Sequence, residues 1–212
     1  MSATRAKGPC DVAAVLRSMW AGIARESRRT PLVHWNESVF RFMFVRALLS
    51  EYPHVRCDVE WRRVDLLIRD SDGPSLIEFK YYVRPWLVDL RGKRIRPKGG
   101  PSKKNFGEFC GCVEKLAQID NSTWRATDDV PFAHRYIILA YADSIDMVGP
   151  QSYSYWYDEI RLPAETRKKA SLVRLLTLDD IHCPIADAHH KCALFEVATY
   201  FKRNRGQAGN RY

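Results

Sequence analysis

Apolar residues at helical spacing mark two segments near the amino terminus. In the first segment they fall on one face of a helix that Asp11 is placed to cap. These residues are Val12, Val15, Leu16, Met19, Trp20 and Ile23. The second segment begins near Asn36, a good capping residue, and carries apolar residues through Leu48 before Tyr52-Pro53 ends it. The pattern predicts two successive helices.

The pattern then changes to one typical of strands. A β-prone run from Val59 to Ile68 leads to Asp72-Gly73, a dipeptide that predicts a tight hairpin turn, and a second strand covers 76–83. Apolar residues at helical spacing return between Phe106 and Ala117. The run 136–141 is too continuously apolar for a one-sided strand, so we expect it in the sheet centre with both faces covered.

The carboxyl-terminal third completes the pattern of elements. An aromatic-rich stretch from Ser152 to Tyr157 suits either base stacking or simple burial. We predict a strand from Leu172 to Leu178 and a closing helix from Asp187 to Phe201. The order helix, helix, strand, strand, helix, strand, strand, helix predicts an α/β fold with a central mixed β-sheet flanked by helices.

The chain of 212 residues has a length that suits one domain. We expect a core over 34–142, a helical extension over 1–33, a further part of the same domain over 143–201 and a basic tail over 202–212. No stretch approaches the roughly 18 apolar residues of a membrane span. The first thirty residues lack the central apolar block of a secretory signal. A soluble cytoplasmic protein with six free cysteines is the expectation.

Positive charge is in excess and is concentrated in one loop. The chain has 34 Lys and Arg against 25 Asp and Glu, a formal net charge of +9, and its 46% apolar content excludes a disordered tail. The stretch 91–104 holds seven basic residues and no acid, with enough Gly and Pro to prevent regular structure. Such a loop either binds a nucleic-acid backbone or serves solubility. The phosphate contacts would come from Arg91, Lys93, Arg94, Arg96, Lys98, Lys103 and Lys104.

A looser cluster near the carboxyl terminus contains residue types that bind zinc. Its members are His182, Cys183, His189, His190 and Cys192. Their spacing matches no common zinc pattern, which favours ordinary structural roles over a metal site.

The predicted hairpin carries three charged residues in otherwise apolar strands. Because side chains alternate along a strand, Glu78 and Lys80 share one face. A turn centred on Asp72-Gly73 places Asp65 opposite Lys80 and diagonal to Glu78. Charge in apolar surroundings is costly unless it is paired or binds an ion. The three residues therefore form either a Mg²⁺ site with a helper lysine or a cross-strand Asp65–Lys80 salt bridge.

The metal interpretation brings a chemistry with it. A water on Mg²⁺ has a lowered pKa and can attack a phosphodiester, while the ion offsets the charge that develops on the phosphate. The neighbouring Lys80 can orient that water or neutralise the developing charge. Desolvation can also lower the pKa of the lysine enough for it to assist proton transfer.

The same residues, in this order of elements, resemble the core of the PD-(D/E)XK nuclease superfamily, which has the restriction-endonuclease-like fold. Asp65 matches the motif Asp, and Glu78 and Lys80 match its Glu-x-Lys, although Val64 stands where the name-giving Pro would be. The resemblance covers roughly 34–142 and includes the helix before the hairpin, the basic loop and the helix after it.

The resemblance implies Mg²⁺-dependent hydrolysis of phosphodiester bonds, most often in DNA, with Mn²⁺ able to substitute. Asp65, Glu78 and the backbone carbonyl of Phe79 would be the metal ligands, and Lys80 would assist the attacking water. The family also implies a contribution from Glu37, through water or by orienting the lysine. The auxiliary polar residues would be Lys115 and Gln118 on the following helix.

Two other interpretations remain beside a DNA endonuclease. The +9 charge and the 91–104 loop alone suit a non-catalytic nucleic-acid-binding protein. In the third, the charged residues of the hairpin form only a structural ion-pair network. A homodimer would suit cleavage of both strands of a duplex, yet no residue pattern demands it.

Overall fold

The computed structural model describes residues 8–27, 32, 35–82, 87–88, 94–95, 101–119, 131–144, 148–183 and 188–199. Its helices are α1 (Val12–Glu26), α2 (Glu37–Glu51), α3 (Lys103–Gln118), α4 (Tyr153–Tyr157) and α5 (Ala164–Arg167), with the 3₁₀ turn η2 (Gly149–Gln151). Its strands are β1 (Arg56–Trp61), β2 (Val64–Asp70), β3 (Gly73–Tyr82), β4 (Leu87–Val88), β5 (Arg94–Ile95), β6 (His134–Ser144), β7 (Ala170–Cys183) and β8 (Ala188–Thr199).

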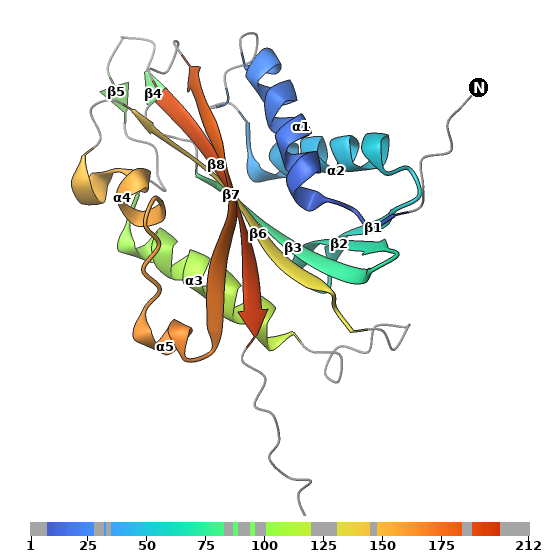
Figure 1. Ribbon diagram of the computed structural model, residues 1–212. Helices are drawn as coiled ribbons and strands as arrows, with labels where there is room; N and C mark the ends of the chain where they lie inside the picture. Colours follow the sequence, from blue (N-terminus) through green and yellow to red (C-terminus); the bar gives the residue numbers. More distant parts are fainter. Residues whose placement is uncertain are drawn as a thin grey trace, which may run out of the picture.

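A mixed six-stranded sheet with the order β1-β2-β3-β6-β8-β7 forms the centre of the protein. β3 and β6 are parallel, and the other neighbours are antiparallel. The short strands β4 and β5 pair separately. Helices α1 and α2 lie on one side of the sheet, and α3, α4 and α5 lie on the other (Figure 1). The predicted α/β fold with a central mixed sheet between helices is confirmed.

Two hydrophobic clusters, one on each face, hold the helices to the sheet. Phe79 of β3 lies in the cluster shared with α1 and α2, and Leu67 of β2 lies in the cluster shared with α3. Along β6, Ile138 belongs to the first cluster and Ile137 to the second, so both faces of this strand are covered as expected. Helix α1 contributes to the first cluster and is part of the core, although it belongs to the expected extension.

The predicted starts of the first two helices are confirmed by their capping geometry. The Asp11 side chain accepts the N–H of Ala14, and that of Asn36 accepts the N–H of Val39. Helix α2 ends at Glu51, just before Tyr52-Pro53. Asn36 therefore determines where α2 begins and places Glu37 in its first turn.

The predicted closing helix over 187–201 is wrong. The segment forms strand β8, which lies between β6 and β7. Leu194 packs into the first cluster and Phe195 into the second, so β8 is covered on both faces. A continuous apolar run fits a buried strand as well as a helix, and the two-sided burial available between β6 and β7 decides in favour of the strand.

The expected single strand over 59–68 is also wrong, because it is divided into β1 and β2. The two strands pair through Trp61 and Val64, which leaves Arg62 and Arg63 as a two-residue turn. Both have positive φ, 45° and 73°, as the tight turn that matches strand twist requires. Arg-Arg is not a typical sequence for such a turn, which explains why the sequence pattern did not reveal it.

The pairing of β2 with β3 differs from the predicted register. Asp70 pairs with Gly73, so the turn residues are Ser71 and Asp72 rather than Asp72 and Gly73. The Asp70 side chain accepts the N–H of Asp72, which stabilises the earlier turn, and Gly73 begins β3 with φ 113°. Because Leu66 pairs with Ile77, continuation by one residue brings Asp65 opposite Glu78, and the predicted pairing of Asp65 with Lys80 is wrong.

Several predictions fall partly or wholly outside the described residues. Of the basic loop, only the strand pairing at 94–95 and the stretch from 101 onwards are described, where Lys103 and Lys104 are exposed at the start of α3. The tail 202–212 is not described. None of the described helices is long and apolar enough to cross a membrane. Five cysteines are free thiols, namely Cys10, Cys57, Cys110, Cys112 and Cys192.

Candidate functional site

Asp65 joins β2 to both β3 and α2. It lies one residue beyond Leu66–Ile77, the β2–β3 backbone pair farthest from the turn. Its Oδ2 accepts the Phe79 N–H at 2.8 Å, and its Oδ1 accepts an Arg41 guanidinium N–H at 3.0 Å. The side chain is only 16% exposed. Asp65 is therefore a nearly buried carboxylate held by two donors.

Arg41 is a site residue that the sequence pattern did not assign. It lies one turn after Glu37 on α2, and it bridges Asp65 to Glu60, with 2.6 Å between Nη2 and the Glu60 carboxylate. The available signal was an arginine within a largely apolar helix, since a buried charge of this kind needs a partner. The sequence pattern could not identify the partner, because Arg41 on α2 and Asp65 on β2 are separated along the chain by strand β1.

Glu78 is a buried carboxylate paired with a lysine from α3. Its residue is 2% exposed, and its Oε1 contacts the Lys115 ammonium, which also donates to the Arg63 carbonyl at 2.8 Å. Burial raises the pKa of Glu78, and the charge of Asp65 raises it further, against the opposing effect of Lys115. The structure thus brings Lys115 into the site, whereas Gln118 is exposed at the end of α3.

Lys80 approaches the other acidic residue, Glu37, with 3.8 Å between Nζ and Oε2. Burial lowers the pKa of Lys80, but the thiolate form of the nearby Cys112 and the Glu37 and Asp65 carboxylates outweigh that effect, so the pKa is raised overall. Lys80 is therefore a lasting positive charge. In the ion-free protein this direction is opposite to the depressed lysine pKa that would help proton transfer.

Glu37 shares the electrostatic environment of the two strand carboxylates. Burial raises its pKa, Lys80 opposes that change, and the charge of Asp65 adds to it. Asp65 thus raises the pKa of both Glu37 and Glu78, so its carboxylate is close enough to repel each of them. One helix, α2, and two strands, β2 and β3, bring these carboxylates together.

The donor chemistry of these residues suits a hard divalent cation. Mg²⁺ takes one or two protein carboxylates and keeps several waters, and here Asp65 and Glu78 repel each other without such an ion. The site is not a preformed cage, because among the described residues no group of three or more His, Cys, Asp or Glu side chains is arranged to hold a metal. Arg41 and Lys115 instead contact the carboxylates directly.

The histidine and cysteine cluster is spread over both faces of β7 and β8. His182 and His189 are cross-strand neighbours with ring centroids 4.9 Å apart. His190 is fully buried, and burial lowers its pKa to about 4. Cys192 is also buried, within the first hydrophobic cluster. The side chain of Cys183 lies outside the described part.

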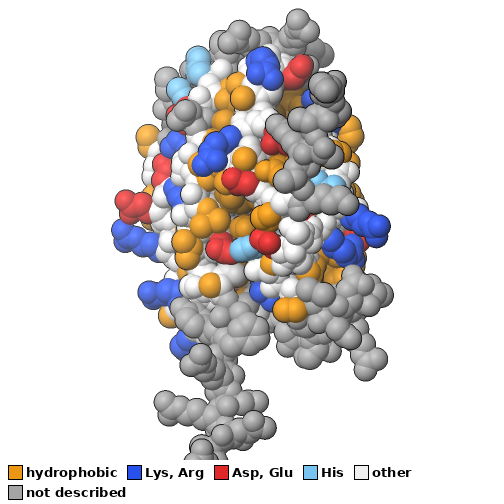
Figure 2. Space-filling view, turned by 45° about the vertical axis from the view of Figure 1, so that its right-hand side comes forward, with side chains coloured by type: hydrophobic (Ala, Val, Ile, Leu, Met, Phe, Trp, Pro, Cys, Tyr) orange, Lys and Arg blue, Asp and Glu red, His pale blue; other side chains and the backbone are white. Residues whose placement is uncertain are grey.

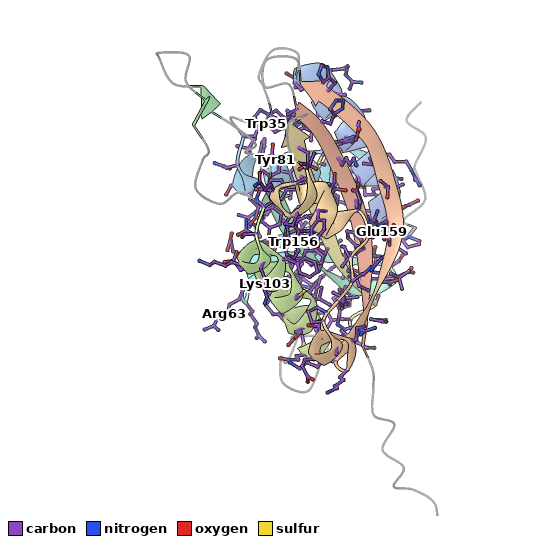
Figure 3. All side chains as sticks on the ribbon, turned by 90° about the vertical axis from the view of Figure 1, so that its left-hand side faces the viewer. Trp35, Arg63, Tyr81, Lys103, Trp156 and Glu159 are labelled. Carbon is purple, nitrogen blue, oxygen red and sulfur yellow. The ribbon has the colours of Figure 1, made fainter. Side chains whose placement is uncertain are left out.

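The charges of the described surface are mixed rather than segregated on the face shown in Figure 2. There, Lys and Arg side chains are scattered among acidic and apolar ones. Figure 3 shows the side of α3, where Lys103 and Arg63 are both found. The described charges on this face therefore do not mark a binding surface by themselves.

The protein has an α/β fold in which helices cover both faces of a mixed sheet. Its candidate site is a group of carboxylates and lysines around the β2–β3 hairpin. Comparisons with protein-family models, curated proteins and solved structures found no match.

Proposed function

We propose that the protein is a metal-dependent phosphodiesterase that cleaves DNA. One observation carries the proposal: Asp65 and Lys80 of the β2–β3 hairpin both act on the charge of Glu78 in the same hairpin and of Glu37 in α2. Bringing four ionisable groups together at a partly buried place opposes folding unless the charges are paired or bind an ion. The resemblance of these residues to a nuclease motif supports the same conclusion.

Asp65 and Glu78 would hold the divalent ion, with the Phe79 backbone carbonyl as a further oxygen donor. The ion would supply an activated water and positive charge that offsets the charge developing on the phosphate. Glu78 would exchange its contact with the Lys115 ammonium for the ion. Asp65 would remain oriented by the Phe79 N–H, which donates to its Oδ2.

Lys80 would act as a fixed positive charge rather than as a base. Its raised pKa keeps the ammonium protonated at neutral pH. The ammonium can orient the attacking water or stabilise negative charge on the phosphate, as preorganised cations do in phosphoryl transfer. Glu37 would hold Lys80 in position, since these two side chains form the ion pair that links β3 to α2.

A structural ion-pair network is the second candidate, and two contacts favour it. Arg41 pairs with Asp65 and Lys115 with Glu78, so each carboxylate already has a neutralising partner. A non-catalytic nucleic-acid-binding protein that uses the 91–104 loop is the alternative suggested by charge.

Nicking of supercoiled plasmid separates the phosphodiesterase from both other candidates. We expect cleavage with Mg²⁺ or Mn²⁺, none with EDTA, and a rate loss of at least about a hundredfold in Glu78→Ala and Lys80→Ala. Asp72→Asn is the matched control, because Asp72 is exposed on the turn of the same hairpin. A Glu78→Ala protein that cleaves at nearly the wild-type rate would exclude the assignment.

Thermal melting with and without Mg²⁺ tests the ion directly. At ten times its dissociation constant, an ion that binds only the folded state adds about 1.4 kcal/mol of stability. For a chain of this length that corresponds to about 3–6 °C in Tm. No shift together with no cleavage would leave the structural network as the explanation.

A further inference from the structure

The structure divides the aromatic-rich segment of α4 into two pairs with different environments. Tyr153 and Tyr157 are buried and stack on Tyr82, with centroids 5.7 and 5.4 Å away. Tyr155 is 57% exposed, and Trp156 is half-buried beside it. The first pair explains why α4 packs on the sheet, whereas the second pair is left facing the surface.

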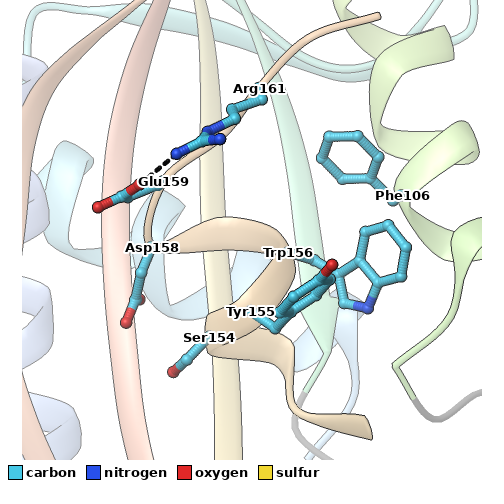
Figure 4. Close-up of a pocket in the computed structure, with 7 residues that line it drawn as sticks. All are labelled: Phe106, Ser154, Tyr155, Trp156, Asp158, Glu159 and Arg161. Carbon is cyan, nitrogen blue, oxygen red and sulfur yellow. Dashed lines mark hydrogen bonds and ion pairs between the residues drawn. The ribbon is translucent and has the colours of Figure 1, made fainter. Parts of the chain in front are cut away.

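The surface-facing pair lines a hollow of about 490 Å³ between α4 and α3. The Trp156 ring lies 5.4 Å from Phe106 and meets Tyr155 edge-on at 5.2 Å (Figure 4). Its indole N–H donates to the Pro150 carbonyl at 3.2 Å, which restrains the ring. The volume falls within the roughly 300–1,000 Å³ typical of ligand sites. The hollow therefore offers a restrained aromatic wall of ligand size.

A second hollow of about 600 Å³ adjoins the first and adds basic groups. The two share Asp158 and Arg161, and the second also contains Arg167 and Arg174. The Arg174 guanidinium lies over the Phe195 ring and donates to the Asp158 carbonyl at 2.8 Å. Arginines held in this way are suited to bind phosphate oxygens.

The acidic residues of the hollows are already neutralised by protein groups. The Asp158 carboxylate accepts the Tyr141 hydroxyl and contacts the Lys191 ammonium at 2.9 Å. Glu159 pairs with Arg161 at 3.1 Å, and both of these side chains are largely exposed. Arg167 and Arg174 thus remain as positive charge that these two acids do not offset.

We propose that the two hollows bind a single-stranded segment of DNA, with one unpaired base on Tyr155 and Trp156 and its phosphates at Arg167 and Arg174. Bases stack on exposed aromatic rings, and arginines bind the backbone between them. In a duplex the base faces are covered by their neighbours, so they cannot reach this wall. The proposal deepens the proposed function by naming single-stranded DNA as part of its substrate.

The position of the hollow relative to the basic start of α3 supports this occupant. Phe106 follows Lys103 by one turn, and Lys103 and Lys104 are exposed there. Figure 3 shows Trp156 and Lys103 on the same side of the molecule. A single DNA strand that contacts Lys103 and Lys104 at the start of α3 can therefore continue into the aromatic hollow.

Fluorescence anisotropy with a labelled oligo(dT) of about 12 nucleotides, a length within the range of known single-strand sites, tests the site in EDTA, where cleavage plays no part. We expect Tyr155→Ala to weaken binding by about 5- to 150-fold, the loss typical of one stacked base. Tyr155→Phe, the matched control, keeps the ring and should bind like the wild type. Arg167→Gln should weaken binding and reduce its salt dependence.

The outcomes distinguish this site from the nuclease proposal. Wild-type protein that fails to bind the oligonucleotide, or Tyr155→Ala protein that binds it as tightly as the wild type, would overturn the stacking site even if plasmid is nicked. An equal loss in Tyr155→Ala for a blunt duplex would also exclude base stacking. Oligonucleotide binding that depends on Tyr155, without metal-dependent nicking, would retain the site and reject the nuclease.

Discussion

Replacing Asp65 with alanine should destabilise the protein, whereas replacing Glu78 with glutamine should not. The two carboxylates lie in the same hairpin and are both largely buried, yet their environments differ. Asp65 accepts hydrogen bonds from the Phe79 N–H and from Arg41. Glu78 has a raised pKa despite its contact with Lys115, so its charged form is disfavoured in the folded protein.

The cost of Asp65→Ala follows from the donors it leaves behind. The N–H of Phe79, a residue with no exposed surface, loses its acceptor, which costs about 1–3 kcal/mol. Arg41 also loses a charged partner but keeps Glu60 at 2.6 Å, so its penalty is partly compensated. We expect a total loss of about 2–3 kcal/mol, or about 4–12 °C in Tm for a chain of this length.

The direction of the stability change in Glu78→Gln follows from proton linkage. A carboxyl group whose pKa is raised on folding contributes stability that is fully present below its unfolded pKa, about 4.3, and lost as pH rises through the folded value. At neutral pH the Glu78 charge therefore opposes folding. Glutamine removes that charge and keeps an oxygen for Lys115. The variant should equal the wild type below about pH 4 and be at least as stable at neutral pH.

Thermal and urea unfolding of both variants in EDTA, followed by circular dichroism across this pH range, measures these differences. Asp72→Ala, on the exposed turn of the hairpin, reports the effect of losing an acid without a buried partner. An Asp65→Ala protein that melts with the wild type would contradict a stabilising role for the Asp65 hydrogen bonds. A Glu78→Gln protein that loses as much stability at neutral pH as Asp65→Ala would show that the Glu78–Lys115 pair is a stabilising ion pair.

Three further predictions concern charge, DNA contact and backbone strain. Lys80→Arg should retain most plasmid nicking while Lys80→Gln loses about a hundredfold, because the raised pKa makes Lys80 a lasting positive charge; equal losses would contradict this role. Neutralising three basic residues of the 91–104 loop should weaken binding to unrelated DNA sequences alike and lower the salt slope by up to about 2.7, and an unchanged slope would assign the loop to solubility. Arg63→Gly should raise Tm by about 2–4 °C because it relieves a positive φ of 73°, whereas Gly73→Ala, at φ 113°, should lower Tm in the same melting experiment.

Local chemistry is sufficient to determine the starts of the first two helices and the alternation of side chains along the strands. The caps at Asp11 and Asn36 determine where α1 and α2 begin, because a side-chain oxygen needs only the N–H groups of the following turn. Alternation along a strand placed Glu78 and Lys80 on one face, since the backbone pleat sets the side-chain period at two residues. These features depend on a few consecutive residues, so the sequence pattern is sufficient to predict them.

The tertiary structure decided which distant groups meet. The segment 188–199 is a strand because β6 and β7 cover both its faces, a condition that periodicity cannot express. The Asp70 side chain stabilises a turn at Ser71-Asp72, one residue earlier than predicted. The resulting register places Asp65 opposite Glu78 instead of Lys80. Arg41 reaches Asp65 only because α2 packs on the sheet. Pairing between separate elements is a property of packing, and packing depends on all the elements of the core at once.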